Sequence, residues 1–196
     1  MKHTRARLAV LGAVASLSLL AACGAPPEQQ GHQGHGPATS QAPRKHNQAD
    51  VTFAQGMVVH HQQAIEMSKS ATDRAGSPEV RELAEQIAAA QRPEIDLLNG
   101  WLRDWGAAPA QHSGHGGHQQ MDGMMSAEQM RGLAQASGAD FDRRFLSMMI
   151  EHHEGAVSMA RAELKSGAFP EAKQLAQRII DAQRAEIDTM RGLLAR

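Results

Sequence analysis

Histidine and methionine recur in this sequence at spacings that suit a metal site. The pattern Met-x-x-His-His occurs twice, at 57–61 and at 149–153. Thioether sulfur selects Cu(I), whereas imidazole nitrogen suits Cu(II), zinc, iron and nickel. The two motifs therefore predict a transition-metal site that favours copper, in either oxidation state, and they leave other transition metals open.

Heptad spacing puts further polar residues beside these motifs. The seam positions of four helical stretches include His60, His152, Gln91, Glu94, Gln183 and Glu186. Residues at this spacing share one face of a helix and point into a bundle. We expect His60 near Gln91 and Glu94, and His152 near Gln183 and Glu186. His61 and His153 lie one residue off the seam, either at the site or at the bundle's edge.

Buried polar groups are costly unless they are bonded to one another, to water or to a metal. Di-iron bundles use lone glutamates plus two Glu-x-x-His motifs, but here Met57 and Met149 stand in place of the motif glutamates. A helical zinc protease would need a second histidine after His153-Glu154, and none follows at that spacing. The predicted metal ligands are Met57, His60, His61, Met67, Gln91, Glu94, Met149, His152, His153, Met159, Gln183, Glu186 and Met190. Of these, Met67 and Met159 are the most typical of plain core.

A second metal signal lies between the two motifs, outside the heptad stretches. It consists of His112, His115, His118 and Met121, with Met124 and Met125 close behind. Histidines at 32, 35 and 46 add to it. Histidine-rich tracts are compositional signals of metal binding, so we predict a secondary loop site of modest affinity. The alternative is a polar linker whose histidines bind nothing.

An internal repeat defines the elements that must position these residues. Residues 50–104 align without a gap on 142–196, and 20 of the 55 positions are identical. The natural explanation is a duplicated helical hairpin. Punctuation by Gly, Ser and Pro predicts helices at about 50–74, 78–104, 140–165 and 170–195, with a short helix at about 126–137. The predicted fold is all-α, a ferritin-like four-helix bundle of two repeated antiparallel hairpins with a long crossover.

The N-terminus reads as an export signal. Residues 1–7 are basic, and residues 8–20 are apolar but too short to span a membrane. Leu20-Ala21-Ala22-Cys23 resembles a bacterial lipobox, so Cys23 is predicted to carry lipid and to anchor the chain to a membrane outside the cytoplasm, on the periplasmic or cell-surface side. An ordinary secretory signal with an incidental cysteine is the alternative. Lipidation would leave Met and His as the only soft ligands.

The predicted organisation follows from these boundaries. It comprises a signal peptide at 1–22, a flexible tether at 23–49, a first hairpin at 50–105, a His/Met-rich crossover at 106–138 and a second hairpin at 139–196. Removal of the signal leaves 17 basic and 21 acidic residues, a net charge of −4. This balance argues against nucleic acid as a partner. The sequence leaves the oligomeric state open.

The repeated motifs resemble the signature of the DUF305 family. The resemblance rests on residues 57–67 and 149–159, on Gln91-Arg-Pro-Glu94-Ile95 and Gln183-Arg-Ala-Glu186-Ile187, and on Trp101-Leu102. It implies a ferritin-like bundle, an exported location and, in some members, copper binding linked to copper resistance. Leu193 stands where the first repeat has Trp101.

Three functions remain open on sequence grounds. The first is a copper-binding lipoprotein that sequesters the ion or hands it to a copper-transfer protein, without catalysis. The second is a redox enzyme that oxidises Cu(I) or Fe(II) or removes peroxide, which the loss of two carboxylates disfavours. The third is a structural lipoprotein whose histidines only set helix register.

Overall fold

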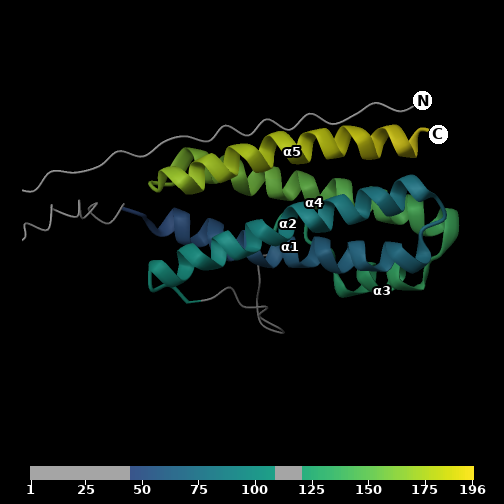
Figure 1. Cartoon of the computed structure of the whole chain (residues 1–196), viewed down its shortest axis with the longest axis horizontal. Coiled ribbons are helices and arrows are strands. Elements are labelled where there is room, and N and C mark those ends of the chain that lie inside the picture. The colour runs from purple at the N-terminus through teal and green to yellow at the C-terminus, as the bar shows by residue number, and fades with distance from the viewer. Residues whose placement is uncertain (1–44, 109–120) are drawn as a thin grey trace, which may run out of the picture. The chain divides into compact units, whose positions relative to one another are not determined.

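The computed structural model describes residues 45–108 and 121–196, which fold into helices without a strand (Figure 1). The helices are α1 (Gln48–Arg74), α2 (Pro78–Asp104), α3 (Ala127–Gln135), α4 (Gly138–Ser166) and α5 (Pro170–Leu194). The prediction of an all-α bundle with two long hairpins and a short extra helix is confirmed. The predicted helix bounds agree with the observed ones to within about two residues.

Local sequence signals explain where the helices begin. Asn47 and Asp50 form a capping box on α1, and Ser126 and Gln129 form another on α3. The Ser77 side chain accepts a hydrogen bond from the backbone N–H of Val80 at the start of α2. Each cap satisfies backbone donors that the first helical turn leaves unpaired.

The two repeats form two antiparallel hairpins, α1 with α2 and α4 with α5. Contacts between α1 and α4 join the hairpins, and α3 packs against this central pair. In Figure 1 the four long helices run lengthwise beside one another, with α3 near one end of α1. The histidine motifs at 57–61 and 149–153 lie on the two helices of the central pair.

Equivalent aspartates fasten each hairpin to the turn of the other. Asp142 accepts hydrogen bonds from the backbone N–H groups of Gly76 and Ser77, both at 2.9 Å. Asp50, which stands 92 positions earlier, accepts them from Ala168 at 3.1 Å and from Phe169 at 2.9 Å. The repeat is thus a structural two-fold as well as a sequence duplication.

The junction at Asp50 carries one group that its counterpart lacks. The buried Glu163 carboxyl lies beside the Asp50 carboxyl, and the equivalent position in the first repeat is Ala71. Burial and the neighbouring, negatively charged Asp50 raise the pKa of Glu163 to about 8. Burial alone would raise the pKa of Asp50, but hydrogen bonds from the backbone N–H groups of Phe169 and Asn47 outweigh it and hold that pKa below its usual value.

The apolar core is divided into two clusters. The first lies toward the 75–77 turn and contains the buried Ala64, Met67, Ile87, Phe145, Met149 and Met190, among others. The second lies toward the opposite end and contains Phe53, Met57, Leu98, Ala156 and Ile179, among others. On every long helix, the boundary between the clusters coincides with polar residues.

Candidate metal centre

A polar layer crosses the bundle between the two apolar clusters. It is made of His60, His61, Gln91, Glu94, His152, His153, Gln183 and Glu186, two from each long helix. The four histidines are fully buried, and the two glutamines are almost so. The prediction that these side chains meet at one level of the bundle agrees with their observed positions. We call these eight residues the histidine layer.

His60 and His152 meet at the centre of the layer. Their ring centroids are 3.7 Å apart, and the rings are tilted by 42°. Burial and the positive charge of nearby histidines lower the pKa of His60 to about 3. Burial and the same kind of repulsion, led by His60, put the pKa of His152 well below its usual value. Both rings are therefore neutral at physiological pH, and each keeps one nitrogen lone pair.

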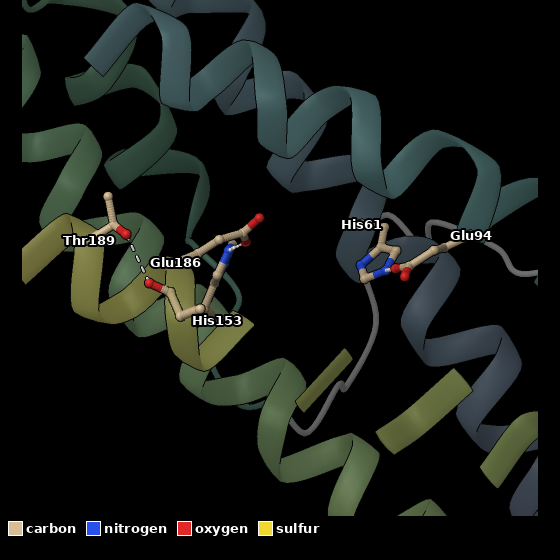
Figure 2. A network of polar contacts seen from close by, with 6 residues as sticks. His61, Glu94, His153, Glu186 and Thr189 are labelled. Carbon is tan, nitrogen blue, oxygen red and sulfur yellow. Dashed lines mark hydrogen bonds and ion pairs between the residues drawn. The ribbon is translucent and has the colours of Figure 1, made fainter. Parts of the chain in front are cut away.

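The glutamates pair with the outer histidines rather than with the central ones. His61 Nε2 lies 2.6 Å from Glu94 Oε2, and His153 Nε2 lies 2.6 Å from Glu186 Oε2 (Figure 2). An ionised carboxylate only accepts hydrogen bonds, so Nε2–H of each ring is the donor. The expectation that Glu94 and Glu186 would face His60 and His152 is therefore wrong by one residue. The histidine that each glutamate contacts is the next one along α1 or α4.

Several buried atoms of the layer have no hydrogen-bond partner in the described part of the chain. They are Nδ1 of each of the four histidines, Nε2 of His152, both amide atoms of Gln91 and Oε1 of Gln183. Unpaired buried polar atoms are rare in folded proteins and call for a functional explanation. A metal ion would satisfy those ring nitrogens that carry a lone pair, so the histidines fit part of the ligand set of such a group.

The methionines fall into two groups. Met57 and Met149 are fully buried and lie one helical turn from the histidines of their own motifs, on opposite sides of the layer. Met67 and Met190 lie deeper in the first cluster, and Met159 is only partly buried, against the second. Seven residues separate Met67 from His60, about 10 Å along a helix. The structure thus keeps Met67 and Met159 out of the layer.

Carboxylates and imidazoles alone do not complete a site. Within residues 45–108 and 121–196, no group of three or more His, Cys, Asp or Glu side chains is arranged to hold a metal ion. A metal centre in the layer would need a further ligand, and the thioethers of Met57 and Met149 are the nearest soft candidates in sequence.

The residues that cover the layer were not predicted from the sequence. The carbonyl oxygen of Asp122 lies 3.3 Å from Nε2 of His60. The Gln63 side chain holds Met125 through both backbone groups, at 2.9 Å and 2.7 Å. Gly155 leaves room for the backbone at 122–123, because a Cβ at Gly155 would lie 2.8 Å from Gly123 Cα. The glycine inside the helix was the available signal. Glycine destabilises a helix, so its presence there often marks a place where another segment approaches the backbone closely.

Several predicted residues lie outside the described part of the chain. They are Cys23, His32, His35, His112, His115 and His118. Met121 is described and packs against α1 at Gly56. His46 is exposed and stacks on Trp105, with ring centroids 4.7 Å apart.

The fold and the layer define a class of protein: an all-α bundle of two repeated hairpins with paired histidines buried between them. Residues 50–194 match the DUF305 family, a domain of unknown function. The chain belongs to this family.

Solved structures share this fold. A DUF305 protein from Streptomyces coelicolor, regarded as secreted, is 37% identical, with a TM-score of 0.68, over 75% of this chain and 91% of that one. A DUF305 fragment from Deinococcus radiodurans is 36% identical, with a TM-score of 0.69, over 76% and 97%. CopM in its Cu(II)-bound form is 35% identical, with a TM-score of 0.65, over 74% and 95%.

A curated relative from Acanthamoeba polyphaga mimivirus, "Uncharacterized protein L153", is 38% identical over 53 residues. The match covers 27% of this chain and 35% of the viral protein, so only about a third of that protein's length is spanned. In the described part of this chain, none of the helices is both long and apolar enough to cross a membrane.

Proposed function

We propose that this protein is an extracytoplasmic copper-binding protein that holds the ion in the histidine layer and sequesters it or passes it to a partner protein. The observation that carries the proposal is the burial of four histidines at one level, each with an Nδ1 that no other described residue partners. Ligand exchange at such a layer would need no covalent chemistry.

The protonation of the layer supports metal binding. A ligating imidazole must be neutral, and His60 and His152 are held neutral by burial. His61 and His153 give their Nε2–H to carboxylates, which leaves Nδ1 with its lone pair. Metal-binding histidines usually donate a hydrogen bond in this way, from the N–H of their second ring nitrogen to a carboxylate, a backbone carbonyl or water. Glu94 and Glu186 would then orient ligands rather than bind the ion.

The choice of copper rests on ligand softness and on relatives. Thioether and imidazole together favour copper over iron or manganese, and Met57 and Met149 supply the thioethers. CopM was solved with Cu(II), with Cu(I) and with silver bound. In this chain the histidines at 112, 115 and 118 would add a secondary loop site of lower affinity.

The location outside the cytoplasm rests on the N-terminal pattern. The apolar run at 8–20 followed by Cys23 supports export and lipid anchoring. A bundle on a tether of residues 24–49 could then meet a copper-transfer protein at the membrane surface.

The test is a metal titration of the mature protein with Cu(I), Cu(II), Fe(II) and Zn(II). We expect tight copper binding that falls by at least about 100-fold when His60 and His152 are both changed to Ala. Residues that bind the ion directly should matter at least as much as the groups that orient them, whose loss costs about 10- to 100-fold. Glu66→Ala/Arg161→Ala is the matched control, since both residues are exposed and lie on the same two helices, α1 and α4. Unchanged copper affinity in the double variant would overturn the proposal, and iron binding with oxygen consumption would favour the redox enzyme.

A further inference from the structure

The segment that follows the crossover is fixed to the bundle at defined points. The backbone N–H of Met124 donates to the carbonyl of Met121 at 3.1 Å, which closes a turn. Gln63 holds Met125, and Asp122 reaches His60. Gly123 adopts a φ of +79°, and a Cβ there would lie 2.6 Å from the carbonyl oxygen of Glu151. The position of Met121 is therefore set by contacts to both α1 and α4.

Two methionines from different segments converge on one glycine of α1. Met121 Sδ lies 3.6 Å from the point that a Cβ on Gly56 would occupy, and Met159 Cε lies 2.8 Å from the same point. The equivalent of Gly56 in the second repeat is Met148. The missing side chain at Gly56 thus makes the room that the Met121 sulfur and the Met159 methyl group both approach.

This pair differs from the methionines of the core. Met121 and Met159 are both partly exposed, whereas Met57 and Met149 are fully buried. Gly56 precedes His60 by four residues, which is about 6 Å along the helix axis. The pair therefore stands beside the histidine layer but closer to solvent.

We propose that Met121 and Met159 form a second metal site at Gly56, for a soft monovalent cation such as Cu(I) or Ag(I). Two neutral thioethers select such ions over divalent ones. The site deepens the proposed function and rests on it. It gives the protein a more accessible position, next to the buried layer, at which an ion can be exchanged.

The test uses Ag(I) as the probe and the methyl signals of ¹³C-methionine-labelled mature protein as the readout. The Met121 and Met159 signals, assigned through Met→Leu variants, should shift together during the titration. Gly56→Ala keeps every sulfur but fills the shared space, so the apparent Ag(I) affinity at both methyls should fall by about tenfold, the lower range for loss of a group that supports a metal site. Gly192→Ala is the matched control, because a Cβ there meets nothing within 4 Å.

The same titration separates this proposal from that for the layer. In the His60→Ala/His152→Ala variant, the Met121 and Met159 shifts should persist even when buried Met57 and Met149 stop responding. Loss of all four responses would show that the thioether pair is no separate site and would overturn the inference. So would a wild-type titration in which either Met121 or Met159 stays unaffected. If Gly56→Ala fails to fold, Met121→Leu tests the same point by abolishing the Met159 shift.

Discussion

The imidazole of His60 lies against the imidazole of His152, with ring centroids 3.7 Å apart. These residues are equivalent in the two repeats, so the pair sits where the two-fold relation between the hairpins brings like residues together. Neither hairpin alone can build this contact, because each supplies one ring. The candidate metal centre is therefore complete only when α1 and α4 have packed.

The central rings should weaken the metal-free fold. Among residues 45–108 and 121–196, neither buried nitrogen of His152 has a hydrogen-bond partner, and an unsatisfied buried polar group costs about 1–3 kcal/mol. We predict that His152→Leu raises the free energy of unfolding of the metal-free protein by about 1 kcal/mol. The measurement is urea denaturation in the presence of a chelator.

The same variant should lose the stabilisation that copper gives the wild type, because a ligand that binds only the native state raises its stability. His60→Leu is the comparison, and its gain should be smaller because it sacrifices the hydrogen bond to the Asp122 carbonyl. A drop in the metal-free stability of His152→Leu would show that the His152 ring stabilises the core, rather than being kept there as a metal ligand at a cost in stability.

The carboxylates should tune metal affinity without binding the ion. Glu186→Gln keeps the side chain's size but removes the charge that orients His153 through the 2.6 Å contact. We expect about a 10- to 100-fold loss of copper affinity, as for other groups that orient metal-binding histidines. A competition titration against a copper chelator measures this, with the exposed Glu85→Gln as control. Complete loss of binding would instead make Glu186 a direct ligand.

The repeat and the heptad seams were enough to predict the hairpins and the level of the polar layer. The partner of each glutamate was predicted one residue out, because the antiparallel register was applied to backbone positions. Helical side chains lean toward the N-terminus of their own helix. In an antiparallel pair, the tips that meet therefore belong to residues slightly further along each helix, as in His61 with Glu94.

The cover over the layer was beyond sequence reasoning for a different reason. Residues 106–123 have no hydrophobic periodicity, so nothing in the sequence showed which part of α1 or α4 they would touch. Gly155 and Gln63 are equivalent positions of the two repeats, and the structure uses both to hold the same segment. This is a departure from two-fold symmetry that a duplicated sequence alone cannot reveal.

Stability should depend on pH through Glu163. Its pKa is raised from 4.5 to about 8 in the folded protein, so between these values the native state binds a proton that the unfolded chain has released. The free energy of unfolding should therefore fall as pH rises from about 4.5 to 8 and level off above 8. Thermal melts of the metal-free protein across this range provide the measurement.

Glu163→Gln tests the cause of this pH dependence. The amide can donate to Asp50 at every pH, so the variant should lose most of the decline and melt higher than the wild type at pH 8. Glu151→Gln, an exposed change on the same helix, should leave the decline in place. If Glu163→Gln follows the wild-type curve, the decline arises elsewhere in the chain.

Gly155 should be needed for the cover rather than for the helix. Alanine is favoured over glycine inside a helix by roughly 0.5–1 kcal/mol, and Gly192→Ala should show that gain because its Cβ meets nothing within 4 Å. At Gly155 a Cβ would instead collide with the backbone of Asp122 and Gly123, which is held on its other side by α1. Gly155→Ala should therefore destabilise the protein despite the better helix propensity. It should also speed hydrogen exchange at the Met125 N–H, whose bond to Gln63 Oε1 is 2.7 Å long. A stabilised Gly155→Ala variant with unchanged exchange at Met125 would mean that the turn does not rest on α4.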